Sequence, residues 1–129
     1  MKSDISNRDD IATLVDAFYD KVKVNPVIGY FFNDVVKVNW EKHLPKMYDF
    51  WEGIVFGSSG YSGNPMNVHK AVHALHAFSK SDFDEWLKLF RQTVDEMYEG
   101  ANAELIKQRA LSIATVMQLK VIHNNQFYG

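Results

Sequence analysis

The residues best suited to chemistry in this chain are its histidines. The 129-residue sequence contains five of them and no cysteine. Without cysteine there is no disulfide, thiolate zinc site, iron–sulfur cluster or cysteine nucleophile, and no C-x-x-C-H attachment of a covalent haem. Any metal chemistry must therefore use imidazole and carboxylate groups. Four of the histidines fall between residues 43 and 76.

Three of these histidines, His69, His73 and His76, form an H-x-x-x-H-x-x-H pattern. In a helix these positions share a face, so the three imidazoles could converge on a zinc or similar ion. The four histidines are also set among bulky apolar residues such as Trp51 and Trp86. Imidazole beside apolar bulk suits a large hydrophobic metal cofactor better than a hydrated ion. Both interpretations are open on these residues alone.

Composition and missing motifs narrow the functional class. Phosphate-cradling glycine loops, G-x-S-x-G and H-E-x-x-H are absent, whereas aromatic residues make up 14% of the chain. Such aromatic content indicates that the fold encloses a large apolar ligand. Acidic residues outnumber basic ones by 16 to 14, so a nucleic-acid partner is not expected. No apolar run approaches membrane-span or signal-peptide length, which predicts a cytoplasmic protein with no membrane partner.

The elements that must position the histidines are all predicted to be helices. Apolar residues recur at helical spacing over residues 11–22, 40–55, 83–97 and about 102–122. Residues 26–33 are predicted to form a short, mostly buried aromatic helix or turn, and a short helical stretch follows Pro65. No strand-like alternation is found. The length and pattern predict one all-α domain.

Local signals mark where these helices start and stop. Asn7 or Asp9 can cap the first helix, and Asn39 can cap the helix that carries His43. Pro45 lies early in that helix, so its first turn could be distorted, or the regular helix could begin only after Pro45. Ser79 and Ser81 each precede an acidic residue by three positions, as in a capping box. Gly100 is expected to close the helix over residues 83–97, and residues 123–129 are expected to fray.

In this order, the elements resemble the truncated haemoglobins, most closely their third group. The resemblance spans about residues 11–121 and implies a shortened globin fold of two helices crossed over two, with residues 1–129 as a single globin-like domain around one haem b. The residues that carry it are Phe18-Tyr19, Trp40-x-x-His43 followed by Phe50-Trp51, Gly63-Asn64-Pro65-Met66-x-x-His69, and Phe83-x-x-Trp86-Leu87-x-Leu89-Phe90.

The resemblance assigns roles around the iron. His69 matches the proximal ligand, with His73 and His76 as rivals one and nearly two turns further on. Tyr19, His43 and Trp86 match the distal residues that face a bound ligand. The alternatives are a core role for Tyr19 and Trp86, and a solvent-facing His43 that only controls access. Met47 matches the residue packed over the distal face, and the expected cavity wall comprises Phe31, Phe32, Trp40, Trp51, Val72 and Phe90.

The same resemblance implies a function. The expected ligands are dioxygen and other small molecules such as nitric oxide and cyanide, held by donors that slow release, which favours redox or reactive-nitrogen chemistry over oxygen delivery. Nitric oxide dioxygenase-like or peroxidase-like turnover would need a separate reductase. The alternatives are a small helical metal-binding module using His69, His73 and His76, and a cofactor-free helical sensor.

Overall fold

The computed structural model describes residues 2–35, 37, 39–57 and 79–128, except the side chain of residue 35 and those beyond residue 119. Every regular element in these ranges is helical, as predicted. Most of the helices are amphipathic and bury one face. In chain order they are α1 (Arg8–Val24), the π-helix η1 (Phe31–Val35), α2 (Trp40–Phe56), α4 (Lys80–Met97) and α5 (Ala101–Tyr128).

Helix α1 forms where the sequence predicts it. Asn7 is the N-cap, and its side-chain oxygen accepts a hydrogen bond from the backbone N–H of Asp10 at 2.9 Å. The helix ends at Val24, two residues before Pro26, because the residue preceding a proline is disfavoured in helical geometry. Its buried face carries the six predicted apolar residues Ile11, Leu14, Val15, Phe18, Tyr19 and Val22.

The segment after Pro26 is only partly as predicted. A turn leads into η1, and Ile28 and Phe31 are buried. Val27 is 40% exposed and Tyr30 43% exposed, so the segment is less buried than predicted.

Helix α2 is regular through its first turn. Asn39 caps it, and the backbone N–H of His43 donates to the carbonyl of Asn39 at 2.8 Å. Pro45 lies inside the helix, which begins at Trp40 and does not wait until after the proline. Proline has no N–H, so Pro45 cannot donate the helical hydrogen bond to the carbonyl of Glu41, yet the helix continues through it. His43 is therefore held by helical backbone.

Helices α4 and α5 form an antiparallel pair. Ser79 and Asp82 make the predicted capping box at the start of α4. The helix ends at Met97 with extended Tyr98 as its C-cap, so the expected closure at Gly100 was wrong. Gly100, at φ 146°, instead lies in the link to α5. Helix α5 continues to Tyr128, across most of the segment that was expected to fray.

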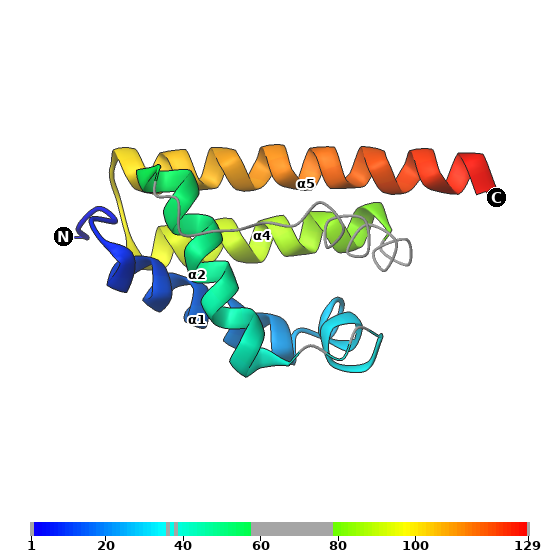
Figure 1. Ribbon diagram of the computed structural model, residues 1–129, viewed down its shortest axis with the longest axis horizontal. Coiled ribbons are helices and arrows are strands. Elements are labelled where there is room, and N and C mark those ends of the chain that lie inside the picture. The colour runs from blue at the N-terminus through cyan, green and yellow to red at the C-terminus, as the bar shows by residue number, and fades with distance from the viewer. Residues whose placement is uncertain (1, 36, 38, 58–78, 129) are drawn as a thin grey trace.

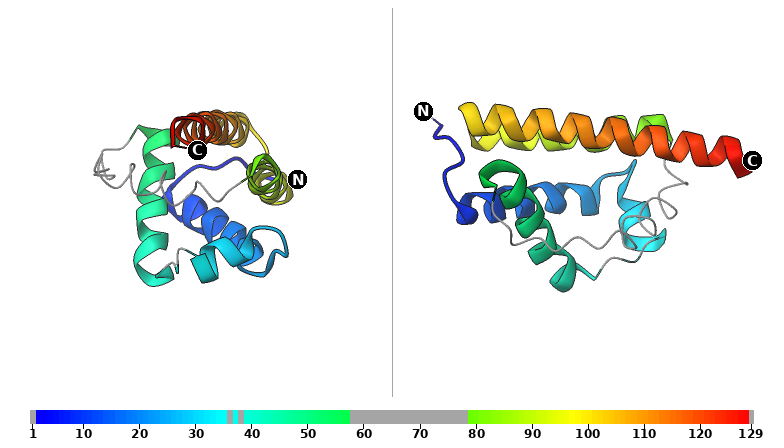
Figure 2. Two further views of the ribbon diagram at one scale, coloured as in Figure 1. Left: turned by 90° about the vertical axis from the view of Figure 1, so that its right-hand side faces the viewer. Right: turned by 45° about the horizontal axis from the view of Figure 1, so that its top comes forward.

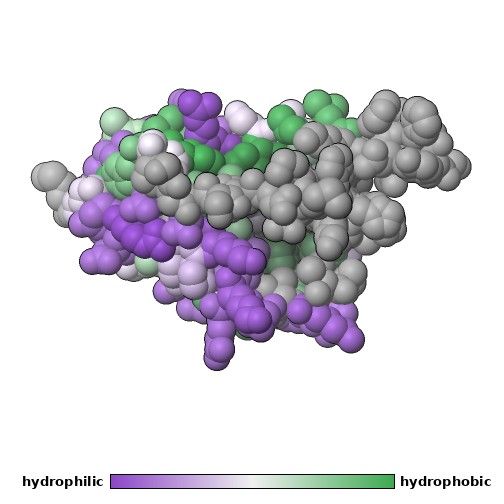
Figure 3. Space-filling model, viewed as in Figure 1, coloured by the Kyte–Doolittle hydropathy of each residue, from purple (hydrophilic) through white to green (hydrophobic). Residues whose placement is uncertain are grey.

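The helices pack as two crossing pairs. α4 and α5 lie side by side, α1 packs against α2 and α4, and α2 reaches across to α5 (Figures 1 and 2). Hydrophilic side chains gather over α1 and the lower part of α2, and apolar surface gathers along α5 (Figure 3). In the centre, Phe18, Trp51 and Phe90 are each 3% exposed or less. None of the described helices is both long and apolar enough to cross a membrane.

Candidate functional site

A cavity of about 220 Å³ opens between the two helix pairs. It is several times larger than the roughly 30 Å³ that a water molecule occupies in the liquid. Its walls are mostly apolar, with a tyrosine, a histidine and a tryptophan among them. The described lining residues are Tyr19, Phe32, His43, Phe83, Trp86, Ile113, Ala114 and Met117.

Tyr19 reaches this cavity from the buried face of α1. It is 5% exposed, and its hydroxyl lies 3.4 Å from Nε2 of His43. Burial disfavours the phenolate and raises the pKa of Tyr19 far above its ordinary value of 10.0. The hydroxyl therefore keeps its proton at every physiological pH and can serve as a hydrogen-bond donor.

His43 faces Tyr19 from the first turns of α2 and is half-buried. Burial lowers the pKa of its imidazole below the usual 6.5, and the positive charge of Lys46, one turn further on, lowers it again. The ring is therefore neutral at pH 7, with one N–H and one accepting nitrogen. Between Tyr19 and His43, the direction of the hydrogen bond follows the imidazole tautomer.

Trp86 enters from α4 and joins the cavity to the aromatic core. Its ring stacks on Phe90 at 5.8 Å with an interplanar angle of 13°, and it meets Phe18 edge-on at 5.7 Å. The indole N–H can donate a hydrogen bond but cannot accept one. Trp86 thus both packs and lines the cavity, so the two interpretations of this residue are compatible.

The other predicted wall residues take different places. Phe32 lines the cavity, and Trp40 lies just outside it, against the rings of Tyr19 and His43. The remaining four described residues belong to the packed interior and are not among the lining residues. They are Phe31, Trp51 and Phe90, which are buried, and Met47, which is partly buried and packs against the hydrophobic core.

His69, Val72, His73 and His76 lie outside the described residues. The proximal role of His69 and the three-histidine alternative therefore remain predictions. Within the described ranges, no cluster of three or more histidine, cysteine, aspartate or glutamate side chains could hold a metal ion.

Four lining residues were not predicted as site residues, namely Phe83, Ile113, Ala114 and Met117. Each was predicted on the apolar face of its helix, but helical periodicity does not separate a cavity wall from a packed core. Ile113 and Met117 also border a neighbouring hollow of about 380 Å³ between α2 and α5. These two side chains therefore separate the cavity from that hollow.

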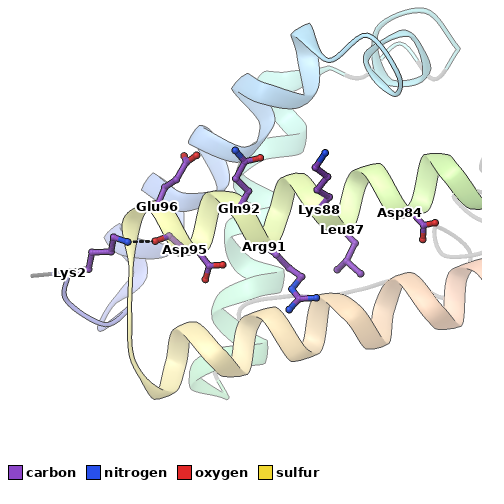
Figure 4. Close-up of a pocket in the computed structure, with 8 residues that line it drawn as sticks. All are labelled: Lys2, Asp84, Leu87, Lys88, Arg91, Gln92, Asp95 and Glu96. Atoms are coloured by element: carbon purple, nitrogen blue, oxygen red, sulfur yellow. Dashed lines mark hydrogen bonds between the residues drawn. The ribbon is translucent and has the colours of Figure 1, made fainter.

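A different kind of hollow, of about 620 Å³, lies along α4 (Figure 4). Seven of its eight described lining residues are polar or charged, and the ammonium of Lys2 donates to the carbonyl of Asp95 at 2.6 Å. Arg91 and Lys88 point in different directions in this view. Charged side chains dominate this hollow and Lys88 and Arg91 do not converge, so it is a poor site for a large apolar cofactor.

The fold and the cavity define a class of protein. The family model described as bacterial-like globin matches residues 3–121. The chain therefore belongs to the bacterial-like globins and is a haem-binding truncated globin. The sequence-based prediction of the truncated globin fold is confirmed.

Two relatives locate the chain within that class. "Group 3 truncated hemoglobin ctb" of Campylobacter jejuni is 33% identical over 121 residues, which are 92% of this chain and 93% of the relative. A crystal structure of group III truncated hemoglobin from Campylobacter jejuni matches with a TM-score of 0.77 at 31% identity. That match covers 94% of this chain and 95% of the crystallised one.

The described residues fit a haem on the side that they form. Aromatic and aliphatic side chains from α1, η1, α4 and α5 supply the apolar wall that a porphyrin requires. The polar groups among them are the hydroxyl of Tyr19, the imidazole of His43 and the indole of Trp86. None of them is a carboxylate or an ammonium group, so the wall buries no unpaired charge.

Proposed function

We propose that this protein binds dioxygen, and also nitric oxide and cyanide, at a haem b held in this cavity. The observation that carries the proposal is the buried, protonated hydroxyl of Tyr19 beside the neutral imidazole of His43 in an otherwise apolar space. The haem iron supplies the binding site for the small ligand and gives electron density to it. His69 would hold the haem iron as its proximal ligand.

Tyr19 and Trp86 are the proposed donors to the ligand. Both side chains line the cavity, and each carries one N–H or O–H proton for a hydrogen bond. A hydrogen bond to a charged group contributes about 1.5–3 kcal/mol, so two such donors slow ligand release strongly. Slow release favours a role in redox or reactive-nitrogen chemistry over oxygen delivery.

His43 is proposed to orient the Tyr19 hydroxyl. If Nε2 carries the proton, it donates to the Tyr19 oxygen and leaves the phenolic O–H for the ligand. If Nε2 is bare, it accepts the phenolic proton and competes with the ligand for it. The neutral imidazole can adopt either tautomer, so His43 adjusts how strongly Tyr19 donates.

The apolar lining is proposed to make these hydrogen bonds effective. Phe32, Phe83 and Met117 surround the donors with apolar side chains. A hydrogen bond is stronger in such a low-dielectric space than in water. Sustained nitric oxide dioxygenation or peroxidase-like turnover would further require a separate reductase to return electrons to the haem.

The visible absorption spectrum of the protein purified with haem tests this proposal. We expect a strong Soret band that shifts when carbon monoxide is added to the reduced protein. A colourless folded protein would remove the haem proposal, and metal analysis would then test the His69, His73 and His76 module. A Soret band that does not shift when carbon monoxide is added would contradict the ligand-binding proposal but not haem binding.

A further inference from the structure

A lysine at the end of α1 lies over the tryptophan that begins α2. The ammonium nitrogen of Lys23 is 4.7 Å from the ring centroid of Trp40. A cation at this distance over an indole face is attracted by the negative charge of the π-system. The contact joins the last turn of α1 to the first turn of α2, the turn that also leads to His43.

Trp40 in turn contacts both polar groups of the cavity. Its ring centroid is 5.2 Å from that of Tyr19 and 5.8 Å from that of His43. Trp40 also lies 6.3 Å from Phe32, which lines the same cavity. A movement of this indole therefore disturbs the Tyr19–His43 pair and the wall beside it.

The backbone that carries Lys23 is itself well fixed. The side-chain amide of Asn33 donates to the carbonyl of Lys23 at 2.9 Å. Gly29 packs so closely that an added Cβ would lie 3.0 Å from the same carbonyl oxygen. Asp20 offers Lys23 a distant ion pair at 3.9 Å, and its side chain is 76% exposed, so this pair holds the ammonium only weakly.

We propose that Lys23 is a positioning residue that holds Trp40 against the Tyr19–His43 pair and so limits how fast small ligands reach and leave the cavity. This inference rests on the proposed function of the cavity as a ligand site. Lys23 touches neither the cavity nor its contents, and it acts through Trp40 alone. Removing its charge releases the indole and raises the population in which the cavity is accessible.

Carbon monoxide kinetics on the haem-loaded protein test this role, because carbon monoxide is a poor hydrogen-bond acceptor and reports mainly on access. Lys23→Met should raise the association and dissociation rate constants of carbon monoxide together by about two- to fivefold, with little change in affinity. This factor corresponds to the energy of an exposed cation–π contact. Lys23→Arg, which keeps a cation, should restore both rates. Lys21→Met, two residues away and paired with Glu96, is the matched control and should leave both unchanged.

A second measurement follows the contact itself. In Lys23→Met, the indole N–H resonance of Trp40 should shift and those of Trp51 and Trp86 should not. Asp20→Asn should reproduce neither the shift nor the faster rates. Unchanged carbon monoxide rates in Lys23→Met would overturn the inference, as would the same acceleration in Lys21→Met. If no variant binds carbon monoxide, the proposed function has failed, and an unmoved Trp40 resonance would separately refute the contact.

Discussion

The hydroxyl of Tyr19 and Nε2 of His43 lie 3.4 Å apart and join α1 to α2 at the edge of the cavity. Each group depends on the other, because a neutral imidazole can accept the phenolic proton or leave it for a ligand. Burial keeps Tyr19 protonated, and burial together with Lys46 keeps His43 neutral. This pair connects the fold to the proposed chemistry.

The free energy of unfolding should depend on pH through His43. Burial, and then the charge of Lys46, lower the pKa of His43 in the folded chain below its usual 6.5. Below pH 6.5 the unfolded chain binds a proton that the folded chain does not yet take, so stability falls as the pH drops. This loss stops growing once the folded imidazole is also protonated.

Urea unfolding at a series of pH values checks this dependence. His43→Gln should show a shallower fall in the free energy of unfolding below pH 6.5 than the unsubstituted chain. The other histidines are present in both proteins and cancel in the difference. Identical slopes would mean that His43 is not held neutral by the fold.

Asp4 should matter for stability because it caps α5 from the other end of the sequence. Its carboxylate accepts hydrogen bonds from the backbone N–H groups of Asn102 and Ala103, each at 2.9 Å. Asp4→Ala should lower the free energy of unfolding by about 0.5–2 kcal/mol, as for loss of an N-cap. Thermal or urea unfolding measures this, with Asp34→Ala as the exposed control.

The same carboxylate should make the free energy of unfolding depend on pH in acid solution. Partial burial raises the pKa of Asp4, but the backbone N–H bonds outweigh it and lower the pKa below 3.8. The stabilisation is therefore complete above pH 3.8 and is lost as the pH falls through the folded pKa. If Asp4→Ala and Asp34→Ala lose stability equally, the capping role is wrong.

Gly100 should tolerate no side chain. Its φ of 146° is in the glycine region, and an added Cβ would lie 2.4 Å from Cγ of Asp4. Gly100→Ala should lower the free energy of unfolding by about 1–3 kcal/mol because of backbone strain, and it should also disturb the Asp4 cap. Gly57 has a φ of 71° but nothing within 4 Å of its Cβ position, so Gly57→Ala should cost less. Equal unfolding midpoints in the two variants would contradict this account.

Phe90 should be the most sensitive position of the aromatic core. It is 0% exposed and stacks on Trp51 at 4.8 Å and on Trp86 at 5.8 Å. Phe90→Ala should lower the free energy of unfolding by about 3–5 kcal/mol, and Phe90→Leu should lower it clearly less. Phe56→Ala, at a 40% exposed position, is the control for losing a phenyl ring. A cost for Phe90→Ala no larger than that of Phe56→Ala would show that this stack does not support the cavity.

Much of the fold could be predicted from the sequence because its signals are local. The buried face of α1, the caps at Asn7 and Asn39 and the capping box at Ser79 depend on residues within one or two turns. The predicted end of α4 was wrong because Gly100 is required by its close approach to the distant Asp4, and not by the end of its own helix. Sequence spacing carries no information about such a contact.

The candidate site was harder to predict for the same reason. Trp51 and Met117 are both apolar residues on inward faces, yet the first is in the packed core and the second lines the cavity. Lys23 looks like any solvated lysine near a helix end, and only the fold brings it over Trp40. The proximal role of His69, the cytoplasmic location and the single-domain organisation remain predictions.

The dioxygen dissociation rate of Tyr19→Phe tests the central claim most directly. Loss of one donor worth about 1.5–3 kcal/mol predicts release that is about ten- to a hundredfold faster, and loss of Trp86 as well should accelerate it further. Tyr30→Phe, which removes a hydroxyl from a 43% exposed side chain outside the cavity, should leave release unchanged. Equal dissociation rates in Tyr19→Phe, Tyr30→Phe and the unsubstituted protein would contradict the claim that the Tyr19 hydroxyl retains the ligand.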